Sequence, residues 1–338
     1  MELIRLCHSY MVAFLLFLIL VSCSKESDIA KEHQYHYISY DTEVTAKQIA
    51  DGSGLLQPKG IAILDDKLYV CNGDVLEVFN AQSLQHLKTI NSFTKGETTI
   101  EFSNLTSIAV DSSRIYIGSR DSRLFVLDKN TNSGISVVGN GQWWQTFVHV
   151  FGVTVADGLM FVKEKENSIK VFDVTQITQN SNWDLEPIAK LNTVTGATEE
   201  YSMDVENGDL VVAGRNAEAF LYYNVDAILS GAEASFTTPI TPIYSPNDGV
   251  KPLSVKFTED WAITSEKIGE DYYLRLYPKE KFMQKDFDPK VSAYDVMGDN
   301  PFGEIIAVEQ LGDRIFISDY TNQQIAIVKL KTSLIIEH

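Results

Sequence analysis

The chain has 338 residues, with 28 Lys and Arg against 46 Asp and Glu, so its formal net charge is −18. A surface this acidic repels phosphate backbones and anionic lipid headgroups, which argues against nucleic acid as a partner. The length suits one large all-β domain as well as two average domains.

The first 22 residues have the layout of a secretory signal peptide. Arg5 supplies a positive charge, and Val12–Val21 is an unbroken apolar run that is short for a permanent transmembrane helix. The run ends in Leu20-Val21-Ser22-Cys23, which resembles the lipobox of bacterial lipoproteins. The resemblance implies cleavage before Cys23 and lipidation of that cysteine; the alternative is an uncleaved signal anchor with a chance cysteine. Ser24, in place of Asp, implies the outer membrane, on its periplasmic side or at the cell surface.

Residues 23–34 are polar and lack periodicity, so they are predicted to form a flexible tether to a domain at 35–338. Within the tether, Lys25–Asp28 resembles the surface-export signals of Bacteroides-type lipoproteins. Cys71 has no cysteine partner inside the domain, since Cys7 and Cys23 belong to the N-terminal segment. No intramolecular disulfide is therefore expected after processing, and Cys71 is expected to pack as a small apolar residue.

Residues 58–332 contain six copies of one pattern: a short apolar strand, a tight polar turn, a second strand, a polar loop and a third strand. The turns are rich in Gly, Asn and Asp, which tolerate positive φ. Repeats of this length are typical of the four-stranded blades of β-propellers. The sequence therefore predicts an all-β, six-bladed β-propeller. The copies align at Ile61, Ile108, Val153, Met203, Val255 and Val308, at spacings of 45 to 53 residues.

A fourth strand for each blade is expected in the variable connections, for example at Gly134–Gly139 and Lys290–Val296. Residues 35–45 alternate like a strand and precede the first repeat. We expect them to pair with the last blade and close the ring, which leaves no open sheet edge.

Two third-strand segments, Leu124–Asp128 and Ile169–Asp173, resemble the repeats of the LVIVD, YncE-like and NHL-like bacterial propellers. Together with the N-terminal segment they resemble a Bacteroides-type lipoprotein β-propeller. The resemblance implies the fold and, by analogy only, nutrient capture beside an outer-membrane transporter.

In such a propeller, the loops entering the innermost strands and those joining second to third strands form one mouth, where a ligand would meet the protein. Trp143 and Trp144 lie in a glycine-flanked loop and would offer a flat face to a sugar ring, another planar ligand or a protein partner. Alternatively, one covers the core and the other braces the loop. Trp183 and Trp261 are expected to be packing residues. The other ligand-binding candidates are Lys59, Arg120, Arg123, His149, Tyr201, Arg215 and Asn216.

Two hypotheses of function follow. The first is a noncatalytic binding or scaffold protein: a monomer without a cofactor, held at the membrane by its lipid alone, that binds a small molecule, a glycan or an outer-membrane protein. The alternative is a divalent-metal-dependent hydrolase, lactonase or lyase, because six-bladed lactonases hold calcium in the channel through oxygen ligands. Its candidate ligands are Glu164, Glu304 and Asp319, with Asn216. The sequence contains neither a GxSxG nor an HExxH motif.

Overall fold

The computed structural model describes residues 31–49, 56–142, 146–165, 168–181, 183–192, 202–215, 218–231, 235–239, 249–289, 291–292 and 301–337. The predicted signal peptide, Cys23 and most of the predicted tether lie outside these ranges. The chain divides into two compact units, one of residues 37–331 and one to which 31–36 and 332–337 belong. None of the helices in the described ranges has the length and apolarity needed to cross a bilayer.

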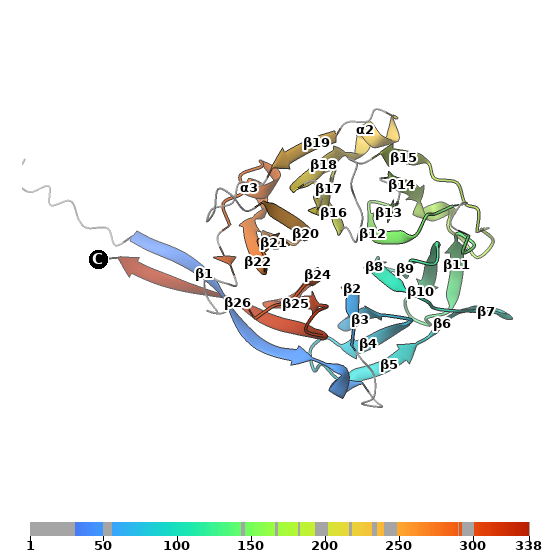
Figure 1. Cartoon of the computed structure of the whole chain (residues 1–338), viewed down its shortest axis with the longest axis horizontal. Helices are drawn as coiled ribbons and strands as arrows, with labels where there is room; N and C mark the ends of the chain where they lie inside the picture. The colour runs from blue at the N-terminus through green and yellow to red at the C-terminus, as the bar shows by residue number, and fades with distance from the viewer. Residues whose placement is uncertain are drawn as a thin grey trace, which may run out of the picture. The chain divides into compact units, whose positions relative to one another are not determined.

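Within residues 37–331, six four-stranded sheets are arranged as blades around a centre (Figure 1). Blade 1 contains β2 (Pro58–Leu64), β3 (Lys67–Asn72), β4 (Val75–Asn80) and β5 (His86–Ile90). Blade 2 contains β8 (Leu105–Val110), β9 (Arg114–Ser119), β10 (Arg123–Asp128) and β11 (Gly134–Val138). Blade 3 contains β12 (Val150–Ala156), β13 (Leu159–Glu164), β14 (Ser168–Asp173) and β15 (Ala189–Asn192).

Blade 4 contains β16 (Met203–Glu206), β17 (Asp209–Gly214), β18 (Ala219–Asn224) and β19 (Ser235–Pro239). Blade 5 contains β20 (Val250–Phe257), β21 (Trp261–Ile268), β22 (Asp271–Pro278) and β23 (Val291–Ser292). Blade 6 contains β24 (Ile305–Leu311), β25 (Arg314–Asp319), β26 (Gln324–Glu337) and β1 (Lys31–Val44). The first strand of each of blades 1 to 5, and β24 of blade 6, lie innermost (Figure 1). The six-bladed, all-β prediction is therefore confirmed.

The order β1-β26-β25-β24 in blade 6 brings the two ends of the domain into one sheet. Asp41 of β1 binds Lys329 at 2.8 Å and Arg314 at 3.1 Å, so ion pairs join this strand to β26 and β25. This order is consistent with the predicted closure of the ring by an N-terminal strand. The strand begins at Lys31, four residues before the start that the sequence predicted at residue 35.

The hairpin turns have the backbone conformation that their residues favour. Asp65, Asp157 and Asn207 adopt positive φ of 49°, 50° and 52°, and Gly158 and Gly312 adopt 77° and 62°. Asx and Gly residues are the ones that tolerate this region at low cost. The turn prediction is confirmed.

The hydrophobic core is divided among the six boundaries between neighbouring blades. Each cluster joins two consecutive sheets: Cys71 of β3 packs in one cluster with Ile117 of β9, and Val171 of β14 packs in another with Leu210 of β17. The cluster that joins Ile327 of β26 to blade 1 completes the circle. Because the alternating strands present apolar side chains on both faces, each blade is buried between its neighbours.

Some elements were not predicted. A hairpin of β6 (Ser92–Lys95) and β7 (Thr98–Glu101) precedes blade 2, and its Phe93 lies 5.9 Å from the Phe125 ring. Trp261 is buried as expected, but the prediction for Trp183 is wrong: it is 43% exposed, because it lies in the connection from β14 to β15 and outside the blade core. In the part of the chain that the structure describes, four short helical segments lie between strands: η1 (Ala46–Gln48), η2 (Val174–Gln176), α2 (Val225–Leu229) and α3 (Lys279–Met283).

Candidate functional site

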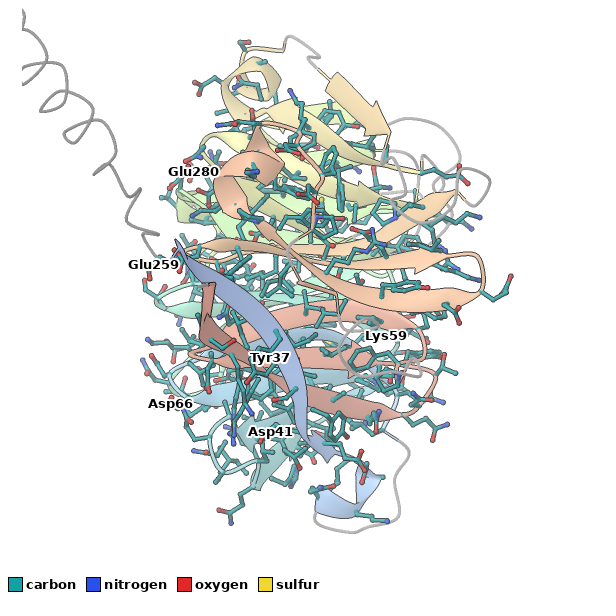
Figure 2. The ribbon with its side chains drawn as sticks, turned by 90° about the vertical axis from the view of Figure 1, so that its left-hand side faces the viewer. Tyr37, Asp41, Lys59, Asp66, Glu259 and Glu280 are labelled. Carbon is teal, nitrogen blue, oxygen red and sulfur yellow. The ribbon has the colours of Figure 1, made fainter. Side chains whose placement is uncertain are left out.

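The innermost strands of all six blades enclose a cavity of about 120 Å³ in the channel. The channel has two ends. We call the end with the loops that enter the innermost strands the loop end, and the end with the hairpin turns between first and second strands the turn end. In Figure 2 the turn residues Asp66 and Glu259 lie on one side of the ring and Lys59, at a loop, lies towards the other.

At the loop end, an ion pair connects two blades that are not neighbours. Arg215 follows β17 of blade 4, Glu304 precedes β24 of blade 6, and Nη1 lies 3.0 Å from Oε1. Both side chains keep part of their surface exposed, 31% and 26%. Tyr272 of blade 5 adjoins them: burial, then the charge of Glu304, raises the pKa of its phenol. Lys267 lies 5.5 Å from the Tyr272 ring, so three blades contribute charged or aromatic groups here.

Elsewhere among the loops, two predicted ligand-binding residues connect blade 2 to blade 3. His149 has a positive φ of 68° and places its ring Nδ1 against the carbonyl of Arg120. The backbone N–H of His149 donates to Ser122 Oγ at 3.2 Å. The Arg120 guanidinium lies 5.3 Å from the Phe151 ring. These contacts favour a structural role for both residues over a free role at the mouth.

Among the remaining candidates, Arg123 donates to the carbonyl of Asn140 at 3.3 Å. Lys59 lies 6.0 Å from the Tyr320 ring. The candidates Trp143, Trp144, Tyr201 and Asn216 lie outside the described residues.

Buried acids at the ends of second strands brace the entering loops of their own blades. Glu164 accepts from Val148 N–H at 3.2 Å and from Lys170 Nζ at 3.0 Å. Asp319 accepts from Gly303 N–H at 3.2 Å and from Asn322 Nδ2 at 2.8 Å.

Two of the three alternative metal ligands, Glu164 and Asp319, are therefore braces in different blades, and the third, Glu304, pairs with Arg215. Within the ranges that the structure describes, no group of three or more His, Cys, Asp or Glu could hold a metal ion.

One position earlier on the second strands of blades 1, 5 and 6, side chains fasten the blade to the next one. Ser318 Oγ donates to the carbonyl of Pro58 at 2.8 Å, and Ser265 Oγ donates to that of Ile305 at 3.1 Å. Cys71 Sγ makes the same contact with Ser107 at 3.6 Å, and its buried thiol confirms the packing role expected for it. Blade 3 carries Lys163 here, whose ammonium donates to the carbonyl of Glu164. Burial lowers the pKa of Lys163 to about 8.

Sequence reasoning missed a charged trio inside the cavity. The residues directly after the six aligned positions are Ala62, Ala109, Thr154, Asp204, Lys256 and Glu309, and all of them line the cavity. The signal was present in the repeat alignment, because strand alternation gives these equivalent residues the same orientation in every blade.

The ammonium of Lys256 joins the two carboxylates of the trio. Its Nζ lies 3.1 Å from Glu309 Oε1 and 3.9 Å from Asp204 Oδ2, and Asp204 also accepts from Phe257 N–H at 2.8 Å. Burial opposes the charge of Lys256, but the two carboxylates outweigh it and raise its pKa. Burial raises the pKa of Glu309 as well, so its charge is disfavoured while that of Lys256 is favoured. The two directions agree with one ammonium shared between two carboxylates.

No protein-family model and no curated protein matches the chain. Solved structures match it at the level of the fold. The WD40 repeats of RRP9 are 10% identical over 82% of this chain and 96% of that chain, with a TM-score of 0.55. A chain of the mitotic checkpoint complex is 11% identical over 78% and 71% (TM-score 0.49), and the computationally designed Ika8 protein is 10% identical over 80% and 70% (TM-score 0.45).

At this identity the likeness to RRP9 establishes the architecture alone. The chain is an all-β, six-bladed propeller with four-stranded blades.

Proposed function

We propose that the protein is a noncatalytic binding protein whose loop end takes a ligand or a protein partner. The observation that carries the proposal is the partly exposed Arg215–Glu304 pair, which spans from blade 4 to blade 6 beside Tyr272 of blade 5. Partly exposed charged and aromatic groups from separate loops are what a polar ligand or a partner surface engages.

The proposal includes a location in the cell envelope. A lipidated Cys23 and a short polar tether would hold the propeller at the outer membrane, as the resemblance of residues 20–23 to a lipobox implies. A propeller held in this way would capture a small molecule or a glycan, or serve as a scaffold beside an outer-membrane transporter.

The binding proposal is tested by thermal unfolding of residues 25–338 against a panel of glycans, planar ligands and divalent cations. A ligand present at one hundred times its Kd stabilises the folded state by about 2.7 kcal/mol. The shift should disappear in Arg215→Gln and Glu304→Gln, which break the loop-end pair. It should persist in Lys281→Gln, which breaks a more exposed surface pair with Asp286.

The outcomes separate the hypotheses. A shift that both loop-end variants retain would refute binding at this mouth. A shift produced by calcium and reversed by a chelator would instead favour the metal-dependent hydrolase, lactonase or lyase.

The lipid anchor has its own test in the full chain. Cells grown with labelled palmitate should label the wild type and Cys7→Ala but not Cys23→Ala. Equal labelling of Cys23→Ala would refute the anchor while leaving the binding proposal intact.

A further inference from the structure

We propose that the channel cavity binds a small protonated amine, held between Glu309 on blade 6 and Thr154 on blade 3. This site uses none of the loop-end residues, so it stands or falls independently of the proposed function. The argument starts from the uneven wall of the cavity. Blades 1 and 2 contribute the apolar Ala62 and Ala109, whereas the four following blades contribute polar side chains that can form hydrogen bonds.

The charge of the wall favours a cation. Among the described residues that line the cavity, three are ionisable: Asp204, Lys256 and Glu309. The carboxylates of Asp204 and Glu309 share the single ammonium of Lys256 in a confined space, where charges interact more strongly than in bulk water. A bound cation would pair with Glu309 and stabilise its ionised form, which burial otherwise disfavours.

A second, independent observation is the hydroxyl of Thr154. The residue is only 7% exposed and lines the same cavity. Within the described part of the chain, its hydroxyl makes no hydrogen bond, although it is not sealed off from the cavity. The hydroxyl therefore faces the cavity and can accept a hydrogen bond from a ligand bound there.

The donors and the volume favour an amine over a metal ion. Calcium takes six to eight oxygen ligands, more than two carboxylates and one hydroxyl supply. An ammonium group needs only a few acceptors, and its alkyl part would lie against Ala62 and Ala109. A cavity of about 120 Å³ is close to the roughly 150 Å³ that accommodates benzene, so the ligand has on the order of six heavy atoms or fewer.

The test uses propylammonium as the probe, with residues 25–338 followed by thermal unfolding at pH 7. At ten times its Kd the amine should raise the midpoint by about 2 °C, given the unfolding entropy of a domain of this size. Neither 1-propanol, which lacks the charge, nor tetramethylammonium, which lacks N–H donors, should do so. Calcium is included as a separate arm.

Variants locate the site. Glu309→Gln keeps the shape but removes the charge and should weaken amine binding about 10- to 100-fold. Thr154→Val is isosteric and should weaken it about 3- to 10-fold. The matched control is Glu206→Gln: Glu206 pairs with Lys279 at 3.2 Å, yet it does not line the cavity, so its loss should leave binding unchanged.

Three results would overturn the proposal: no shift with propylammonium up to high millimolar concentration, an equal shift with 1-propanol or tetramethylammonium, or full binding by Glu309→Gln. A shift with calcium alone would also overturn it. If Glu309→Gln fails to fold, unchanged binding by Thr154→Val would be sufficient to reject the site.

Discussion

Blade 5 contains a buried ion pair whose removal should be costly. Arg275 Nη1 lies 3.0 Å from Glu266 Oε2, and the two side chains are 2% and 0% exposed. The other oxygen of Glu266 accepts from Tyr277 at 2.7 Å and from Thr264 at 2.8 Å. Arg275→Leu would leave the carboxylate buried without its cation, which costs about 3–5 kcal/mol.

The cost converts to a thermal shift. Unfolding entropy is about 2.1 cal/mol/K per residue, or about 0.6 kcal/mol/K for a domain of roughly 300 residues. Arg275→Leu should therefore lower the midpoint by about 5–8 °C, measured by calorimetry. Adding Glu266→Gln should recover part of the loss, because a neutral amide can still accept from Tyr277 and Thr264.

The control is a pair with similar geometry at the surface. Lys267 and Glu270 lie 3.1 Å apart, but Glu270 is 96% exposed. Glu270→Gln should move the midpoint by less than about 1 °C. If Arg275→Leu cost no more than this control, the inference that the buried pair stabilises blade 5 would be wrong.

Three further predictions concern single positions. Gly60→Ala would place a Cβ 2.6 Å from Ser107 Cα, so it should cost more in urea unfolding than Gly73→Ala, where only the positive φ of 60° is strained; equal costs would contradict the close approach of blades 1 and 2. Lys163 has its pKa lowered to about 8, so between pH 8 and about 10.5 the unfolded chain binds more protons and stability rises with pH. Lys163→Met should remove that slope and be the more stable protein at pH 7, and parallel pH profiles would refute this. Because burial raises the pKa of the Cys71 thiol, a thiol reagent should label it only in denaturant, and rapid labelling of the folded protein would count against its position.

The architecture could be predicted because its signals are local. Alternation in each strand and Asp or Gly at each turn are legible within a few residues, and six repetitions reinforce them. The connections between strands and between blades differ from one repeat to the next, so repetition does not reinforce their prediction. Among the described residues, the β6–β7 hairpin has no counterpart before another blade, and Trp183 lies in a connection and not in a repeated strand, so the repeat pattern did not indicate its exposure.

The candidate site was harder to predict because its members come from different blades. Arg215 and Glu304 are 89 positions apart and meet across blade 5. Asp204, Lys256 and Glu309 are spaced like the repeats, but nothing in spacing alone says that charges at these positions share one cavity. Glu164 and Asp319 were predicted as alternative metal ligands, but each accepts from a backbone N–H group, a partner that a sequence does not display.

The sheet order β1-β26-β25-β24 has a consequence for how the protein is made. Among the described strands, β1 precedes all the others in the chain and its neighbour β26 follows them. During synthesis, β1 therefore lacks the strand it pairs with until every intervening blade has been made. Blade 6 can be completed only once β26 is available, so the edge of β1 stays open to chaperones, or to wrong partners, for most of that time.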